Sequence, residues 1–494
     1  MRILHVIDHI GAGGPARSLL TFAKHTKSIR PDIEHRILSL RQDGYPPLFF
    51  SARRMGLDVV RSPHRAVVNE LVDSSDVVLL HFWNTPLFWE FFSAECPARY
   101  VVWSKVMGTA PPQMLNRHML KGAASVVLTA DPGWPELDHE RVRIVPGIAD
   151  FGRVESVRSE RHAGFNVDYI GATNCGKIHP GFARMMSRVE VPGIGIRICS
   201  GQTDPHLIQA IKASGKSERF RCLGFVEDIS TVLKTSDVFG YPLSENTYAT
   251  SDKSLQEAMY AGVPPVIFPH GGPARFVQNG KTGLVANSED EFVHAIEYLY
   301  RNPDKRAELG QNAKDYARVA FAPSVHAADL LKAVTTAVEM PARKIMPGLA
   351  DTSHAVLFLI SQGWQTPEAV SAVEQWQDGS GSELDAWVTS LPLQAFQVEG
   401  GIVHWRNHAR GDPALRWWSA LWLFKLGRYG EADKELEAAI SNGAPLERCL
   451  QLRSAIRIVS NPALEKRDDG ARSSTNLLLT KLGLSQAPHN GFEA

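Results

Sequence analysis

The segment 241–285 places a carboxylate and two glycines beside elements that could hold an anionic ligand. Glu257 lies near the middle of a predicted helix, and the apolar run 263–268 that follows has the pattern of a short buried strand. Gly271 and Gly272 come shortly after this strand. Ligands of open α/β sheets bind outside the carboxyl ends of the strands, where glycines let the backbone approach a ligand closely. The segment therefore predicts an anion-binding site.

The start of the chain carries a second glycine-rich turn. Residues 3–7 have a buried-strand pattern that leads through Gly11, Gly13 and Gly14 into the helical pattern of residues 17–25. A strand, a glycine turn and a helix form the repeating unit of Rossmann-like folds. The turn reads G-A-G-G rather than G-x-G-x-x-G, and no acidic residue follows at the offset that recognises a ribose. We therefore expect no dinucleotide cofactor.

Apolar strand patterns recur along the first two thirds of the chain. A first series covers residues 3–7, 35–40, 76–82, 99–106, 125–130 and 142–147. A second series covers residues 166–173, 194–201, 219–225, 237–243, 263–268 and 282–286. Because strands that alternate with helical segments favour parallel sheets, we predict an α/β fold with two Rossmann-like, doubly wound domains facing each other across a cleft. They would cover residues 1–155 and 165–335, with a linker near 150–164 where apolar periodicity is lost.

The last third of the chain differs in composition, since seven of the 11 tryptophans follow residue 340. Residues 414–445 have the pattern of two amphipathic helices around Gly427 and resemble one tetratricopeptide repeat. No second copy is evident, although residues 450–459 could cap the pair. We predict a Trp-rich α-helical domain over residues 340–494 that could bind a protein partner.

Composition argues against several other classes of protein. Lys plus Arg and Asp plus Glu both number 53, so the net charge gives no reason to expect a nucleic-acid partner. The five cysteines are scattered without metal-ligand spacing, which favours reduced thiols. No apolar run is long enough to span a membrane, and we expect a cytoplasmic protein, at most peripheral at the inner face of the membrane. The tail after Asn461 is expected to be partly disordered, apart from a short helix at 476–484.

Three motifs follow one another between Glu257 and Val285. E-A-M-x-A-G-V-P-P-V begins at Glu257, G-G follows at Gly271, and N-G-x-T-G-L-V ends at Val285. This order resembles the donor-binding half of the retaining glycosyltransferases of family 4, which have the two-domain GT-B fold. The resemblance extends upstream through FRCLGFVEDISTVLKTSDVFGYPLS and includes the N-terminal MRILHVIDHIGAGGPARSLLTFA. It covers roughly residues 1–335 and leaves the last third outside.

The resemblance implies a nucleotide-diphosphate sugar as donor substrate, linked to UDP or GDP. Glu257 matches a glutamate that accepts hydrogen bonds from the ribose hydroxyls, and Lys177 matches a lysine that binds the diphosphate. A solvated helix glutamate and a surface-loop lysine are the structural alternatives. We expect no metal ion or other cofactor, because no Asp-x-Asp pattern ends a strand and the resemblance implies metal-independent transfer. The further donor-binding candidates are Gly13, Gly14, Thr250, Ser251, Phe225, Val226, Gly271 and Gly272.

Two positions depart from the family pattern. Ala249 stands where the first motif glutamate is expected, and Ala172 replaces an arginine that directly follows a glycine. Glu245 and Asp252 are nearby carboxylates, but neither has the expected spacing. We therefore expect the diphosphate to be bound by Lys177, backbone amides and helix N-termini.

His81 is the candidate catalytic residue. It ends the strand pattern DVVLLH, where an exposed side chain would point into the cleft, although a structural role is an equal alternative. After the next strand pattern, where the family often has another histidine, this chain has Lys105. We expect front-face transfer in which His81 or the donor phosphate assists the acceptor proton.

The resemblance and the residues together favour an enzyme that moves a sugar from a nucleotide sugar to a glycan, a lipid-linked or a protein acceptor. The alternative from another class is a catalytically degenerate GT-B scaffold that binds a partner through residues 340–494, motivated by Ala249 and Ala172. A sugar-nucleotide epimerase, which needs no acceptor, is a third possibility that the helical domain disfavours.

Overall fold

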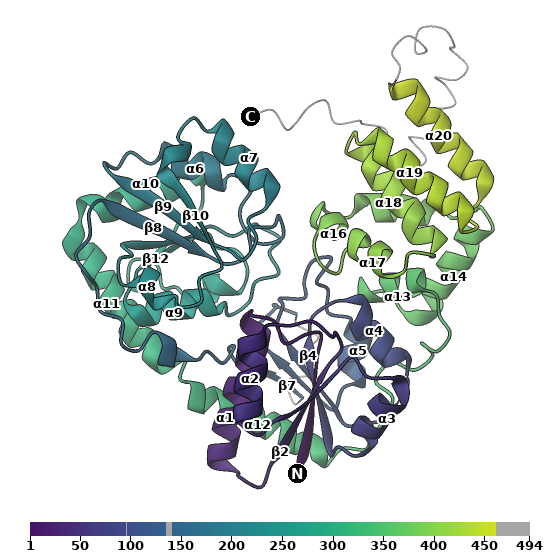
Figure 1. The fold of residues 1–494 in the computed structure, drawn as a ribbon, viewed down its shortest axis with the longest axis horizontal. Helices are drawn as coiled ribbons and strands as arrows, with labels where there is room; N and C mark the ends of the chain where they lie inside the picture. Colours follow the sequence, from purple (N-terminus) through teal and green to yellow (C-terminus); the bar gives the residue numbers. More distant parts are fainter. Residues whose placement is uncertain (95, 135–140, 461–494) are drawn as a thin grey trace.

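The computed structural model describes residues 1–94, 96–134 and 141–460, and the helix expected at 476–484 lies outside the described residues. Three parts are visible (Figure 1): a Rossmann-like domain coloured purple to blue, a second one in teal, and a green to yellow helical part. Both predicted α/β domains and the predicted helical part are present, so the predicted architecture is confirmed.

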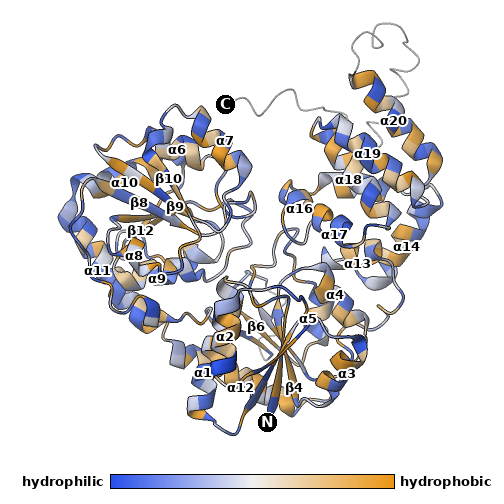
Figure 2. Cartoon of the chain, viewed as in Figure 1, coloured by the Kyte–Doolittle hydropathy of each residue, from blue (hydrophilic) through white to orange (hydrophobic). Residues whose placement is uncertain are grey.

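The first domain is built on seven parallel strands in the order β3-β2-β1-β4-β5-β6-β7. Its strands are β1 (Arg2–Ile7), β2 (Glu34–Ser39), β3 (Asp58–Arg61), β4 (Val77–Phe82), β5 (Tyr100–Ser104), β6 (Ser125–Leu128) and β7 (Val142–Ile144). Its helices are α1 (Gly14–Ile29), α2 (Pro46–Arg54), α3 (Arg65–Asp73), α4 (Pro86–Ser93) and α5 (Arg117–Gly122). All six residues of β4 are buried, as expected for a parallel strand covered on both faces, and Figure 2 shows the strands of this sheet mostly in orange.

The second domain has six parallel strands in the order β10-β9-β8-β11-β12-β13. They are β8 (Phe165–Ile170), β9 (Ile194–Cys199), β10 (Phe220–Gly224), β11 (Val238–Tyr241), β12 (Pro265–Ile267) and β13 (Leu284–Val285). The helices are α6 (Phe182–Arg188), α7 (Pro205–Ala213), α8 (Ser230–Leu233), α9 (Lys253–Ala261), α10 (Glu289–Arg301) and α11 (Pro303–Ala320). Helix α9 is followed by Gly262, whose φ of +86° is the left-handed conformation that glycine adopts without strain.

The predicted boundary at residue 335 is wrong, because the last helix of that range belongs to the first domain. Helix α12 (Pro323–Val338) packs against α1, β4, β5 and β6. Its buried residues Leu330 and Val334 share one apolar cluster with Phe22 and Trp103 of the first domain. In Figure 1 this green helix lies beneath the purple and blue domain. The chain therefore crosses between the domains twice, once near residue 150 and once before α12.

The helical part is not independent of the first domain, as a separate domain over 340–494 would be. It comprises α13 (His354–Ser361), α14 (Thr366–Gln377), α15 (Ser382–Ser390), α16 (Gln394–Gln397), α17 (Ile402–His408), α18 (Pro413–Lys425), α19 (Tyr429–Ser441) and α20 (Leu446–Ser460). Its buried tryptophans, Trp405 and Trp418 among them, form one continuous apolar cluster with Phe88 and Trp89 of α4. Hydrophobic burial therefore joins the helical part to the first sheet. We call residues 354–460 the helical extension.

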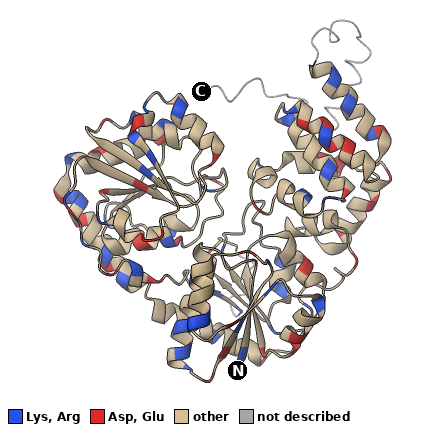
Figure 3. Ribbon diagram, viewed as in Figure 1, with Lys and Arg blue, Asp and Glu red and all other residues tan. Residues whose placement is uncertain are grey.

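The predicted helix pair around Gly427 is present as α18 and α19, and α20 packs on α19 as the predicted cap. Its assignment to the tetratricopeptide class stays a prediction. Side chains of both charge signs are spread over all three parts of the molecule (Figure 3), in line with the net charge of zero. In the parts of the chain that the structure describes, no helix is long and apolar enough to cross a membrane.

Candidate functional site

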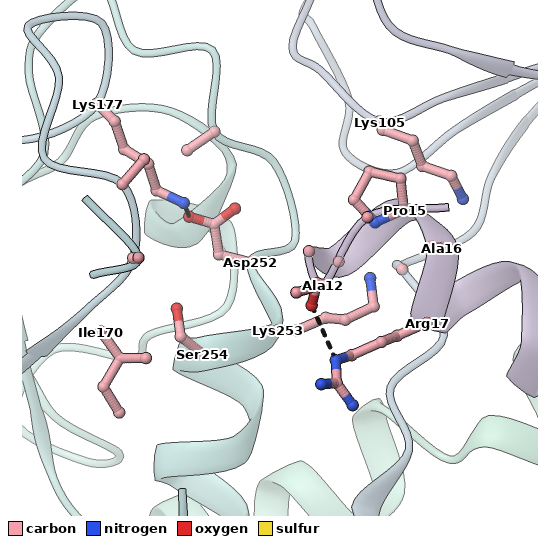
Figure 4. Close-up of a pocket in the computed structure, with 18 of the residues that line it drawn as sticks. Ala12, Pro15, Ala16, Arg17, Lys105, Ile170, Lys177, Asp252, Lys253 and Ser254 are labelled. Atoms are coloured by element: carbon pink, nitrogen blue, oxygen red, sulfur yellow. Dashed lines mark hydrogen bonds and ion pairs between the residues drawn. The ribbon is translucent and has the colours of Figure 1, made fainter. Parts of the chain in front are cut away.

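A cavity of about 490 Å³ lies between the two Rossmann-like domains. The glycine-rich turn 11–14 borders it from the first domain, and the turn 171–177 and the start of α9 border it from the second. Figure 4 shows Arg17 and Lys105 on one side of this space and Lys177 and Asp252 on the other, with the side chain of Lys253 extending toward Arg17. Most of the predicted site residues line the cavity, namely Gly13, Gly14, His81, Lys177, Phe225, Val226, Thr250, Ser251 and Glu257.

Two helices begin at the cavity. Helix α1 begins at Gly14, and α9 begins at Lys253 directly after Asp252. The two helix starts are close together, since a Cβ atom on Gly14 would lie 3.3 Å from Lys253 Nζ. The partial positive charge at the N-terminus of a helix favours an anion, so both helices contribute to the same electrostatic field.

Lys177 is held by a carboxylate in the wall of the cavity. Its Nζ lies 3.2 Å from Asp252 Oδ2, and the Tyr241 hydroxyl donates to the same carboxylate oxygen. Burial lowers the pKa of Lys177, but the charge and hydrogen bond of Asp252 together with the effect of Tyr248 outweigh burial, and the net result is a raised pKa. Lys177 is therefore a fixed positive charge that faces the cavity.

Three further cationic residues at the cavity, Lys253, Arg17 and Arg153, were not predicted as site residues. Lys253 is two positions beyond the predicted Ser251, and burial lowers the pKa of its amine to about 8. Arg17 lies in the first turn of α1 and donates from Nε to the Ala12 carbonyl at 3.0 Å. A signal in the sequence was available for Lys253, because the first residues of a helix after a strand face the ligand in this kind of fold.

Glu257 is a buried carboxylate, with 7% of its surface exposed. Burial raises its pKa, against the opposing effect of the positive charges of Arg153, Arg17 and Lys253. Its Oε1 lies 3.4 Å from Arg153 Nε. The alternative of a solvated helix glutamate is therefore excluded, and a hydrogen-bond acceptor faces the cavity among cations.

The prediction that His81 is an exposed strand-end side chain is wrong. It lies within β4, is 1% exposed, and its Nε2 lies 3.0 Å from His5 Nδ1. His5 Nε2 in turn lies 2.8 Å from His35 Nδ1. These residues occupy the same face of neighbouring strands because side chains alternate along a strand. Burial, reinforced by Lys105 and His5, lowers the pKa of His81 well below its usual value, so its imidazole is neutral.

Gly271 and Gly272 do not line the cavity. They pack against the loop 249–251, which does line it. The Gly272 amide, expected to bind the donor, donates to the Ala249 carbonyl at 2.9 Å. A Cβ atom on Gly272 would lie 2.5 Å from Thr250 Cα, so only glycine lets the two loops pack this closely. Gly271 lines a separate cavity. The two glycines thereby hold the loop 249–251 in place.

The hydroxyls of Thr250 and Ser251 join the two domains. The Ser251 hydroxyl accepts from the Gly147 amide, and the Thr250 hydroxyl donates to the Lys105 carbonyl at 3.4 Å. Phe225 also reaches the first domain, where its ring meets that of Tyr45 edge-on at 5.5 Å between centroids. Phe225 is not part of the core, because 47% of its surface is exposed.

Asp252 lies three residues after Ala249, the position of the missing motif glutamate, and it is engaged with Lys177. Ala249 is 1% exposed and offers no carboxylate. Among the described residues, one group of three side chains is close enough to hold a metal ion: Glu90, His354 and His408. It does not line the cavity, and each histidine is already hydrogen-bonded to Glu90 Oε1, at 2.9 and 2.6 Å.

Similarities to known proteins agree with the fold described above. Residues 183–316 match the model of the family described as glycosyl transferases group 1. The fold is GT-B. Among solved structures, a glycosyltransferase from Rickettsia africae ESF-5 is 13% identical, with a TM-score of 0.56, and the alignment covers 68% of this chain and 98% of that one. Anabaena Alr3699/HepE in complex with UDP and glucose is 15% identical, with a TM-score of 0.54, over 68% of this chain and 100% of that one.

A curated relative matches over a shorter stretch. The alpha-monoglucosyldiacylglycerol synthase of Acholeplasma laidlawii is 29% identical over 135 residues, which are 26% of this chain. The match spans 33% of the length of that relative. The residues that match the family model, 183–316, lie within the second Rossmann-like domain.

Proposed function

We propose that the chain is a metal-independent retaining glycosyltransferase that transfers a sugar from a UDP- or GDP-linked donor. The observation that carries the proposal is the cation-lined cavity between the two domains of the GT-B fold. Lys177, Lys253 and Arg17 border it together with two helix starts, which suits a diphosphate. The carboxylate of Glu257 lies among these cations and suits the two hydroxyls of a ribose.

The family match and the UDP bound by HepE support a nucleotide sugar as donor. Front-face transfer needs no protein nucleophile: the positive charges stabilise the departing diphosphate, and a donor phosphate oxygen accepts the proton of the acceptor hydroxyl. We assign this proton transfer to the donor phosphate ahead of His81. The cost of placing a charge on His81 at its buried position is high, because Lys105 already lies nearby.

Calorimetric binding of UDP-, GDP- and ADP-sugars in the presence of a chelator tests the proposal. We expect one nucleotide to bind wild type and to bind Glu257→Ala at least about tenfold more weakly, because a hydrogen bond to a charged group is lost. Glu374→Ala, at an exposed position of α14, is the matched control and should bind like wild type. Failure of all three nucleotides to bind would exclude the proposed donor site, and binding that requires a divalent ion would exclude metal independence.

A nucleotide-binding scaffold without turnover is the second candidate. It is favoured by Ala249, which leaves the expected carboxylate position occupied by a buried methyl group. Measuring release of nucleotide diphosphate alongside binding separates the two candidates. Binding without release, with every acceptor class tested, would favour the scaffold. Deletion of the helical extension is unsuitable for this test, since it would expose the apolar surface of α4.

A further inference from the structure

The helical extension reaches the cavity through one short segment, residues 394–399, which we call the bridging segment. Gln394 Nε2 donates to the Pro111 carbonyl of the first domain at 2.7 Å and to the Asn246 carbonyl of the second at 3.0 Å. At the other end of the segment, Val398 and Glu399 line the cavity itself. A Cβ atom on Gly176, in the turn that carries Lys177, would lie 3.3 Å from Val398. The bridging segment thus contacts both Rossmann-like domains where they meet.

Glu399 is fixed in orientation at this point. Its Oε2 accepts from Trp83 Nε1 at 2.9 Å, and its Oε1 lies 3.6 Å from an Arg41 guanidinium nitrogen. Its backbone carbonyl accepts from Gln113 Nε2 at 2.8 Å. The side chain is still 36% exposed, so the carboxylate keeps acceptor capacity toward the cavity.

Two aromatic rings adjoin this carboxylate. The rings of Trp83 and Tyr248 meet edge-on, with 5.4 Å between their centroids, and both residues line the cavity. A second carboxylate, Asp8, also lines the cavity and is 4% exposed. Burial raises the pKa of Asp8, but hydrogen bonds from His9 and Thr85 outweigh burial and lower it, so Asp8 is ionised. Arg41 and His9 offset part of this negative charge.

The carboxylates and the cations that line the cavity come from different segments. Lys177, Lys253 and Arg17 lie in the turn 171–177 and at the starts of α9 and α1. Glu399 is hydrogen-bonded to Trp83, and Arg41 lies near both Glu399 and Asp8. Carboxylates repel a phosphate or another anionic head group, and they accept hydrogen bonds from hydroxyls. An indole ring offers an apolar face that can lie against the C–H face of a sugar ring.

We propose that Glu399, Trp83 and Tyr248 form the acceptor subsite and that the acceptor presents an uncharged sugar ring. The inference rests on the proposed function, and it deepens it by assigning the acceptor class and by giving the helical extension a direct role in the site. Glu399 accepts hydrogen bonds from hydroxyls of the acceptor sugar, next to the hydroxyl that attacks the donor. Trp83 supports the ring and holds Glu399 in position.

Steady-state transfer assays on the full chain test this subsite. Neutral mono- and disaccharides, a phosphate-bearing lipid in detergent, and a serine-containing peptide serve as acceptors with the donor that binds best. We expect transfer to a saccharide, and a rise of about ten- to hundredfold in the saccharide KM of Glu399→Gln, because a charged hydrogen-bond acceptor is lost. Nucleotide affinity measured by calorimetry should stay at the wild-type value. Glu374→Gln on α14 is the matched control and should leave both quantities unchanged.

Trp83→Phe provides a second variant, since it keeps an aromatic ring and removes the N–H that holds Glu399. We expect a smaller rise in KM than for Glu399→Gln, with an unchanged thermal midpoint showing that the variant is folded. Transfer to the lipid or the peptide alone, or an unchanged saccharide KM in Glu399→Gln, would overturn the subsite and leave the donor site intact. If the wild-type protein binds no nucleotide, the proposed function and this inference are both overturned.

Discussion

The donor end and the acceptor end of the cavity are assembled in different ways. At the donor end, Lys253 and Glu257 lie on a single helix, and Lys177 lies in the turn after β8 in the same domain. At the acceptor end, Trp83, Tyr248 and Glu399 come from three different parts of the molecule. Site residues that lie in one domain can be recognised from short motifs, whereas Arg17 of the first domain and the residues of the acceptor end reach the cavity through the way the parts pack. The comparison predicts that the two ends respond independently to substitution.

The largest effect is expected when the two predicted donor residues are removed together. Lys177→Ala combined with Glu257→Ala should weaken nucleotide-sugar binding by about two to four orders of magnitude, since each charged contact contributes roughly 1.5–3 kcal/mol. Lys212→Ala combined with Glu374→Ala removes the same residue types at exposed positions and should bind normally. Calorimetric titration measures both. Wild-type affinity of the first double variant would show that the donor does not bind at this end.

A core substitution in the helical extension tests whether the acceptor end depends on packing. Trp418 is fully buried, and its Nε1 donates to Asp385 Oδ1 at 3.1 Å. We expect Trp418→Ala to lower the free energy of unfolding by about 3–5 kcal/mol, and Trp418→Phe to lower it less. Because the apolar cluster is shared with α4, the extension and the first domain should unfold in one transition. Two separate transitions in a denaturant titration followed by tryptophan fluorescence would contradict the shared core.

Strand patterns in the sequence predicted the fold well, because consecutive apolar residues between turns are typical of parallel strands covered by helices. They could not show that α12 returns to the first domain. Its sequence has the pattern of a helix with one apolar face, but residues 323–338 carry no signal that indicates which sheet this face covers. The tryptophans of the last third were predicted to form a domain of their own for a similar reason. The sequence shows which helices have an apolar face, but the surface that each face packs against is decided by the tertiary structure.

The same limit explains which site residues were predicted. Glu257 and Lys177 were identified from motifs, and both line the cavity. His81 was predicted from its place at the end of an apolar run, but its histidine partner His5 lies on another strand, and so does His35, the second partner of His5. Glu399 carries no motif and follows no strand. Its position at the cavity results from contacts such as Trp83 Nε1 to Glu399 Oε2, which join residues 316 positions apart in the chain.

Proton uptake on binding of the nucleotide sugar tests the charge of Lys253 at the donor end. Burial lowers the pKa of Lys253 to about 8, so near pH 8 a substantial fraction of the free protein has a neutral amine. A bound diphosphate favours the charged form, so binding should take up protons, and affinity should fall by at most about tenfold per pH unit above 8. Calorimetry at pH 8 in buffers of different ionisation enthalpy measures the uptake. The Lys253→Arg variant stays charged, so its binding should take up no proton at this position. Equal heats of binding in all buffers for wild type would contradict the predicted proton uptake.

The smallest expected effect lies at the contact between α4 and the helical extension, away from both ends of the cavity. Burial raises the pKa of Glu90, but hydrogen bonds from His354 and His408 outweigh it and lower the pKa to about 2. The lowered pKa means that Glu90 contributes stability above pH 4.5, and this contribution is lost as the pH falls toward 2. The pKa of His354 is raised, chiefly by its hydrogen bond to Glu90 and against the effect of burial. Its contribution is therefore complete below pH 6.5 and is lost as the pH rises through the folded-state value.

The contact should thus be strongest between about pH 4.5 and 6.5. Because the side chains are about a third exposed, we expect Glu90→Gln to cost only about 1 kcal/mol in that window, and less at pH 8. Denaturant titrations at pH 5.5 and pH 8 give the difference in free energy of unfolding between wild type and variant at each pH. Equal differences at both pH values would mean that the charge on His354 does not contribute to holding the extension on α4.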